Sequence, residues 1–331
     1  MCRRLAPGHH GRAPIIPHVG RIASAPPRPE WYKRRGATQA PRDPDSGKGH
    51  RVDLEYSLAL GVAAAAAAIL GSMLGLGGGV FIVPIFTLYL DVDPKIAVGA
   101  SALAVVTNSV VGSSNHLRNG FTNIRLSMLL QVTTAMGAIA GAIIAIWVNA
   151  SILKVVLGAI LVYAAVSMVR GRRRTWPNAA PTDPDPLSLG ASYVDTSSGK
   201  QVRYIPQRLP LGLGISTGAG VLSGMLGIGG GVIQVPMMNL VMRMPVKAAA
   251  GTSSFMVGMT AVATAAVFYS EGKLDPQVAV PAMLGVFVGS QFGSTLTRRL
   301  RTERLIIIFF IILTYLGLSM VLDAFGLNPF G

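Results

Sequence analysis

The feature that most constrains this chain is a glycine-rich segment of twelve residues that occurs twice. Residues 73–84 read MLGLGGGVFIVP, and residues 225–236 read MLGIGGGVIQVP, at an offset of 152 residues. Ser101 aligns with Ser253 at the same offset, and the alignment needs no gap over about 70 residues. The chain therefore contains a duplicated unit, and both copies place a glycine break inside a long apolar stretch.

Long apolar stretches and few charges indicate a polytopic membrane protein. Charged residues make up 13% of the chain, against about 25% in a typical soluble domain. The net charge of +15 does not indicate nucleic-acid binding, because eleven basic residues lie in the first 51 positions and others cluster beside apolar segments, as at Arg170–Arg174 and Arg298–Arg304. Such clusters set membrane orientation and contact lipid headgroups. We therefore expect the lipid bilayer, and no nucleic acid, as a partner.

The apolar runs divide the chain into four parts. The N-terminal part is basic and lacks the apolar core of a signal peptide, so we expect a disordered tail. The part between the two apolar blocks is polar and shows no periodicity, which is typical of a linker. The predicted boundaries are 1–53 for the tail, 54–170 for transmembrane repeat 1, 171–208 for the linker and 209–325 for transmembrane repeat 2.

Each unit contains one apolar segment that is too short to cross a membrane. Val80–Leu90 and Val232–Met242 have eleven residues each, whereas a full crossing needs about 20. The short segment either continues the preceding helix, which gives parallel repeats, or turns back as a re-entrant hairpin, which gives inverted repeats. Equivalent loops are basic in one unit and nearly neutral in the other, which favours inversion. We therefore predict an all-α integral membrane fold of two inverted-topology repeats, each with a glycine-broken re-entrant hairpin and three transmembrane helices.

The glycine breaks suggest an anion site. Consecutive glycines weaken a helix by about 1 kcal/mol each relative to alanine, so helix stability does not account for them. They allow positive φ angles, and the short helix after each break presents free amides and roughly half a positive charge at its N-terminus. Two facing N-termini would form a cationic pocket without lysine or arginine. The substrate-binding residues predicted on this basis are Gly75, Gly77, Gly78, Gly79, Ser101, Asn108, Gly227, Gly229, Gly230, Gly231, Thr252 and Ser253.

Simpler interpretations stay open for several of these residues. Glycines permit close helix packing in membranes, and polar side chains join helices by hydrogen bonds; for Asn108 the two interpretations weigh equally. Met73 and Met225 adjoin the breaks and are predicted to wall the pocket, although methionine commonly fills gaps in a core. The one cysteine, Cys2, lies in the tail. We therefore predict no metal site, no cofactor and, for want of a nucleophile–base pair in the membrane region, no enzyme.

The paired segments resemble the TauE/SafE family of membrane proteins. The resemblance rests on both glycine segments and on the Lys-x-Ala-x-Gly stretches that begin at Lys95 and Lys247, and it covers about Ser57 to Leu322. It implies export of sulfite or small organosulfonates such as sulfoacetate, in a multi-pass protein of the bacterial plasma membrane.

The residues and the resemblance together predict a secondary transporter of small sulfur-containing oxyanions. It would export its substrate by alternating access around an anion site at the membrane midplane. Its partners would be the small anion and the bilayer, with a homodimer as the assembly considered. The alternatives are an anion channel and a non-transporting membrane scaffold or assembly protein.

Overall fold

The computed structural model describes most of the chain beyond the N-terminal tail. All described residues belong to one compact unit, Val52–Gly331. The tail predicted for residues 1–53 lies outside them. The described ranges are 54–74, 77–118, 120–171, 185, 187–194, 201–296 and 302–327.

The described residues form ten helices, five from each copy of the duplicated unit. Unit 1 contributes α2 (Leu54–Leu74), α3 (Gly79–Tyr89), α4 (Pro94–Arg118), α5 (Ile124–Trp147) and α6 (Ala150–Gly171). Unit 2 contributes α7 (Leu209–Leu226), α8 (Gly231–Leu240), α9 (Val246–Ser270), α10 (Pro276–Leu296) and α11 (Thr302–Ala324). Four of the five pairs begin at residues 152 positions apart, so the duplicated sequence has duplicated structure.

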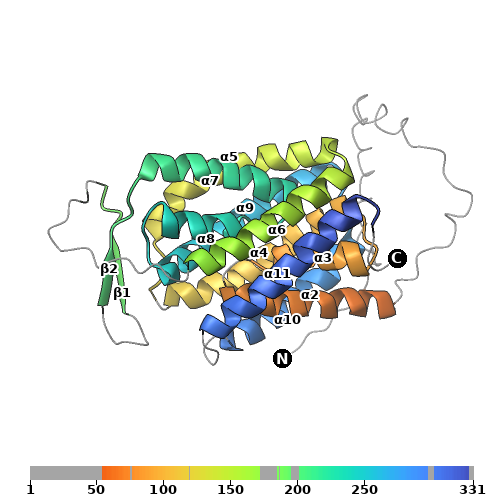
Figure 1. The fold of residues 1–331 in the computed structure, drawn as a ribbon, viewed down its shortest axis with the longest axis horizontal. Coiled ribbons are helices and arrows are strands. Elements are labelled where there is room, and N and C mark those ends of the chain that lie inside the picture. Colours follow the sequence, from red (N-terminus) through yellow and green to blue (C-terminus); the bar gives the residue numbers. More distant parts are fainter. Residues whose placement is uncertain are drawn as a thin grey trace, which may run out of the picture. The chain divides into compact units, whose positions relative to one another are not determined.

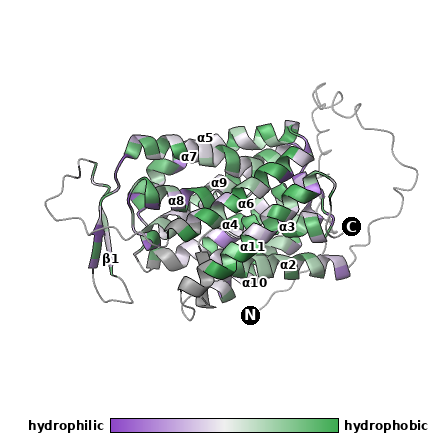
Figure 2. Ribbon diagram, in the orientation of Figure 1, coloured by the Kyte–Doolittle hydropathy of each residue, from purple (hydrophilic) through white to green (hydrophobic). Residues whose placement is uncertain are grey.

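Seven of these helices are long and apolar enough to cross a membrane. In Figure 2 the green of hydrophobic residues predominates along the helices, whereas purple, hydrophilic residues appear near helix ends and outside the helices. The first helix of each unit is among the seven, whereas α10, whose glutamines lower its hydropathy, is not. The candidate spans are Leu54–Ser72, Pro94–Ser114, Ile124–Trp147, Ala150–Ser167, Leu209–Leu226, Val246–Ser270 and Ile307–Ala324.

In both units the short helix turns back along the helix before it. Tyr56, in the first turn of α2, donates a hydrogen bond from its hydroxyl to the carbonyl oxygen of Leu90, just after α3, at 3.1 Å. Gly71 in α2 packs against Gly78, where α3 begins. In unit 2 the amide of Gln207, just before α7, donates to the carbonyl oxygen of Met242, just after α8, at 3.1 Å. The breaks are therefore the tips of two helical hairpins.

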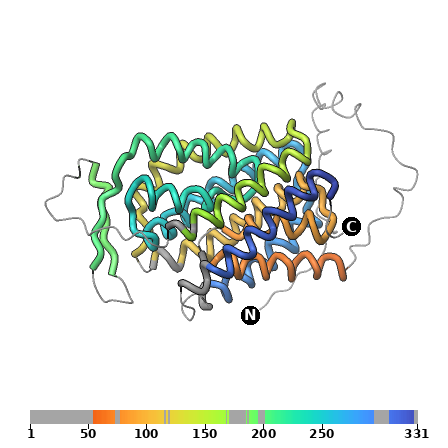
Figure 3. Tube along the Cα trace, viewed as in Figure 1, coloured from red at the N-terminus to blue at the C-terminus, as the bar shows by residue number. Residues whose placement is uncertain are grey.

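The first helix of each unit packs against a helix of the other unit. The first helix of unit 1, α2, packs along α10 of unit 2, and α7 packs in the same way along α5 (Figure 1). Figure 3 shows α2 and α10 side by side although they lie far apart in the chain. Small residues make these contacts: a Cβ on Gly293 would lie 2.6 Å from the carbonyl oxygen of Ile69. Glycines at such positions let the two backbones approach closely.

Equivalent helices of the two units run antiparallel where they pack together. Gly99 near the start of α4 approaches Phe268 near the end of α9, whereas Ser109 further along α4 approaches Gly258 earlier in α9. The helices α6 and α11 also pack antiparallel, since Lys154 pairs with Asp323 near the opposite ends of the two helices. These two pairs of equivalent helices therefore run antiparallel to each other.

The expected linker, 171–208, contains more structure than its composition indicates. Strands β1 (Ala191–Val194) and β2 (Gln201–Tyr204) pair antiparallel, with Ala191 opposite Tyr204. The fold is therefore mostly helical, with a β-hairpin that the all-α prediction missed. Four-residue strands are too short to show a period, and tertiary packing of their tyrosines against the α4–α5 loop stabilises them.

Candidate functional site

Both short helices begin after a glycine in the left-handed region of backbone conformation. Gly78 precedes α3 with φ 76°, and Gly230 precedes α8 with φ 80°. The Gly230 carbonyl oxygen accepts hydrogen bonds from the amides of Ile233 (3.1 Å) and Gln234 (3.0 Å). The backbone amides of the first two residues of α8 therefore make no hydrogen bond within the helix. Such helix N-termini attract anions.

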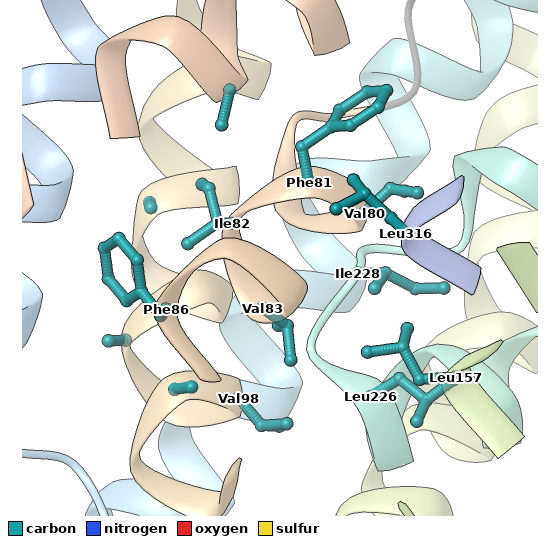
Figure 4. Packing of buried hydrophobic residues seen from close by; sticks show 14 of the residues in the cluster. Val80, Phe81, Ile82, Val83, Phe86, Val98, Leu157, Leu226, Ile228 and Leu316 are labelled. Atoms are coloured by element: carbon teal, nitrogen blue, oxygen red, sulfur yellow. The ribbon is translucent and has the colours of Figure 1, made fainter. Parts of the chain in front are cut away.

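The structure brings the two breaks into contact. A Cβ built on Gly79 would lie 2.8 Å from the Gly227 carbonyl oxygen and 3.1 Å from Ile228 Cα. One built on Gly77 would lie 3.7 Å from the carbonyl oxygen of Ile228. Figure 4 shows Ile228 of the second break in the same buried cluster as Val80 of α3. The glycines that the sequence pairs by alignment are thus neighbours in space.

Two equivalent valines lie between the breaks. The Cγ1 atoms of Val105 in α4 and Val257 in α9 would lie 2.7 and 2.6 Å from a Cβ on Gly229, and 3.3 and 2.9 Å from one on Gly77. Each valine is the twelfth residue of a helix of 25. At 1.5 Å per residue these helices are about 37 Å long, so the breaks lie near the mid-depth of the two helices.

The two predicted serines contact different partners. Ser101 in α4 donates to the carbonyl oxygen of Gly227 at 2.8 Å, which ties unit 1 to the break of unit 2. Ser253 in α9 donates to Gln234 Oε1 at 3.5 Å. Both serines are fully buried. Because a hydroxyl has one proton to donate, Ser101 here holds the break in place, and its contact with substrate stays a prediction.

Sequence reasoning missed two polar side chains beside the second break. Ser223 in the last turn of α7 and Gln234 in the first turn of α8 are both 0% exposed. Among the described residues, Ser223 Oγ and Gln234 Nε2 have no hydrogen-bond partner. They flank the same glycine, because a Cβ on Gly230 would lie 3.4 Å from the hydroxyl and 3.5 Å from the amide nitrogen. The sequence signal that could have found them is that unit 1 has apolar residues, Gly71 and Ile82, at the equivalent positions.

The remaining predicted residues lie further from the breaks or outside the described part. Asn108 lies one turn beyond the central valine of α4, is 3% exposed, and its Oδ1 has no partner among the described residues. Thr252 accepts a hydrogen bond at 3.1 Å from a backbone amide of the α4–α5 loop. Met225 is buried in the main apolar cluster. Two predicted positions lie outside what the structure describes, namely Gly75 and the side chain of Met73.

Charged residues are absent from the two glycine breaks and lie at the two ends of the helical bundle. The sequence has no Asp, Glu, Lys or Arg between Tyr56 and Leu90 or between Leu209 and Met242, so backbone and neutral groups make the field at the breaks. One end, which we call the arginine end, is where α6 ends and α9 and α11 begin; the other is the carboxylate end. Among the residues whose side chains the structure describes, the arginine end carries Arg125, Arg203, Arg208, Arg243, Lys247 and one carboxylate, Asp185, and the carboxylate end carries Glu55, Asp91, Asp93, Lys95, Lys154, Glu271, Lys273, Asp275 and Asp323.

The β-hairpin side of the linker packs on the arginine end. Asn123, at the start of α5, donates from its side-chain amide to the carbonyl oxygen of Leu189 at 2.7 Å. The rings of Phe121 and Tyr193 meet edge to face with centroids 5.2 Å apart. Burial raises the pKa of Tyr204 to about 12, so this hydroxyl stays neutral at physiological pH. Within the described ranges, no group of three or more His, Cys, Asp or Glu could hold a metal ion.

Comparison with known proteins identifies the family. The family model described as sulfite exporter TauE/SafE matches residues 60–320. The chain belongs to this family. Its membership and the seven candidate spans make it a multi-pass membrane transporter, which would contact lipid and small substrates. This confirms the resemblance seen in the sequence, and the bacterial relatives agree with the plasma membrane.

The relatives of this TauE/SafE protein have names of the same kind. It is 24% identical to the probable membrane transporter protein YunE of Bacillus subtilis, over 78% of this chain and 94% of YunE. It is 25% identical to a probable membrane transporter protein of Methanocaldococcus jannaschii, over 77% of this chain and 91% of that protein. A probable membrane transporter protein of Xylella fastidiosa is 27% identical over 70% and 81% of the two chains. The comparison with solved structures finds no match.

Proposed function

We propose that this protein exports small sulfur-containing oxyanions as a secondary transporter, with one anion site formed jointly by the two glycine breaks. The observation that carries the proposal is the direct contact of the breaks between Val105 and Val257. Two helix N-termini there concentrate positive potential in a stretch without charged side chains. Sulfur as the central atom of the substrate is supported by the family alone.

The proposed topology is inverted, so that the two units cross the membrane in opposite directions. Antiparallel packing of α4 with α9 and of α6 with α11 supports it. The return of each short helix along the preceding helix also supports it. If each hairpin enters and leaves on one side, three helices per unit cross the membrane, and an odd number of crossings places the second unit in the opposite orientation. The charge difference between the ends supports a cytoplasmic arginine end.

The site would alternate in access as one unit moves against the other. Close packing of the breaks, with Ile228 buried in the cluster shown in Figure 4, supports a site that is closed to both ends in this structure. The strands β1 and β2 pack on the arginine end against the α4–α5 loop of unit 1, so movement of unit 1 would carry them along.

Flux through proteoliposomes tests this function. Gly78→Val and Gly230→Val place a side chain where φ is 76° and 80°, which disrupts the start of α3 or α8, and we expect sulfite and alkylsulfonate flux to fall to background. Gly218→Val is the matched control, because a Cβ there has nothing within 4 Å. Unchanged flux in both break variants would sink the proposal, and a current that rises with voltage would replace the carrier with a channel.

A further inference from the structure

The second break holds two polar side chains whose hydrogen bonds are unmade. Ser223 Oγ and Gln234 Nε2 are fully buried and have no partner among the described residues. An unsatisfied buried donor costs about 1–3 kcal/mol, so such groups need an explanation beyond packing. A ligand that accepts hydrogen bonds at this position would supply one.

Both donors lie beside the N-terminus of α8. Ser253 donates to Gln234 Oε1, and this uses the acceptor end of the amide and directs its NH₂ group elsewhere. That group lies 3.5 Å from a Cβ built on Gly230, the residue that precedes α8, and Ser223 Oγ lies 3.4 Å from the same point. Side-chain donors and the free amides of α8 therefore converge on one place.

At the two equivalent positions the first break has no such donors. The residue equivalent to Gln234 is Ile82, and the residue equivalent to Ser223 is Gly71, which packs against Gly78 so closely that no side chain fits. Ile82 is fully buried among apolar residues. The paired site therefore has a polar half from unit 2 and an apolar half from unit 1.

The charge available at the breaks sets the charge of the ligand. Each helix N-terminus contributes roughly half a positive charge, so two contribute about one. With no charged side chain between Tyr56 and Leu90 or between Leu209 and Met242, a second negative charge would be buried without compensation, which is costly.

We propose that Ser223 and Gln234 are the specificity-determining donors of the anion site, and that the site selects singly charged oxyanions with one uncharged substituent. The oxygens face the second break and the substituent faces the first. This rests on the proposed function, assigns the charge state and orientation of its substrate, and disfavours doubly charged members of the predicted class such as sulfoacetate.

Binding to the purified, detergent-solubilised full chain tests the charge selectivity without any substitution. Methanesulfonate carries one charge at every working pH, and sulfate carries two. At equal ionic strength we expect methanesulfonate to bind at least about tenfold more tightly than sulfate. Equal or tighter binding of sulfate would overturn the inference.

Substitutions test the two donors. Gln234→Ile introduces the residue of unit 1, and Ser223→Ala removes the hydroxyl; each should weaken methanesulfonate binding about tenfold or more, because a hydrogen bond to a charged group is lost. Ser216→Ala is the matched control, since Ser216 is also fully buried in α7 with an unpartnered hydroxyl two turns away, and unit 1 has alanine there.

The outcomes separate this inference from the proposed function. If wild-type protein binds and transports methanesulfonate but Gln234→Ile retains its affinity within about twofold, the donors are wrong and the transporter stands. If Ser216→Ala weakens binding as much as Ser223→Ala, the assignment to the break is wrong. If wild-type protein neither binds nor moves any sulfur oxyanion, the proposed function fails together with the inference.

Discussion

The two glycine breaks have the same backbone and different linings. Gly77 and Gly229 have φ angles of 89° and 75°, and the glycines that follow them have 76° and 80°. Around this shared backbone, unit 1 places Ile82 where unit 2 places Gln234. Both copies need a break that starts a short helix, and this requirement explains why the glycines are the same. The side chains around the breaks have no such shared requirement and differ between the units.

The paired serines show the same division. Ser101 fixes the second break through the carbonyl oxygen of Gly227, whereas Ser253 contacts the side chain of Gln234. Equivalent residues therefore serve the backbone in one case and a candidate ligand donor in the other. Symmetry of sequence gives a common frame, and the polar chemistry is concentrated at the second break.

The largest expected effect comes from filling the contact between the breaks. Gly227→Ala places a Cβ 2.7 Å from Ser101 Oγ and against the carbonyl oxygen of Val98, at a φ of 66°. We expect a loss of more than about 3 kcal/mol of stability, from left-handed strain and overpacking together. Thermal unfolding in detergent measures it.

A matched glycine isolates the strain. Gly272 has the same φ of 66°, and a Cβ there has nothing within 4 Å. Gly272→Ala should cost only about 1–2 kcal/mol. Equal losses in the two variants would show that the breaks do not pack together.

A smaller effect should separate the two serines. Ser101→Ala removes a 2.8 Å hydrogen bond and leaves the carbonyl oxygen of Gly227 buried and unpaired, for a loss of about 1–3 kcal/mol. Ser253→Ala removes only a 3.5 Å contact, and a bond of that length is weak, so its loss should be under about 1 kcal/mol. Equal losses of stability in the same unfolding assay would show that the two serines contribute equally, which would contradict the proposed difference between them.

The positions of many helices were predictable from the sequence, because the internal repeat and the hydropathy of the segments determine them. The short segments expected at Val80–Leu90 and Val232–Met242 are α3 at Gly79–Tyr89 and α8 at Gly231–Leu240. Helix starts follow from the glycines, and the return of the short helices agrees with the re-entrant alternative that the loop charges favoured.

The chemistry of the site was less accessible. Attention to what the copies share leads to glycines and serines, whereas Gln234 and Ser223 lie where the copies differ. The acceptor of Ser101 is 126 residues away in the other unit, and no local pattern encodes such a contact. The β-hairpin depends likewise on aromatic packing against Phe121.

If the two units enter the membrane from opposite sides, equivalent loop residues lie at opposite faces of the membrane. Asp91 and Arg243 are 152 positions apart, both are exposed, and both have left-handed backbone, with φ of 49° and 55°. In a Cys2→Ser background, single cysteines at these two positions can be labelled from either face of sealed vesicles. Inversion predicts labelling of Asp91→Cys and Arg243→Cys from opposite faces, and labelling of both from the same face would contradict the account.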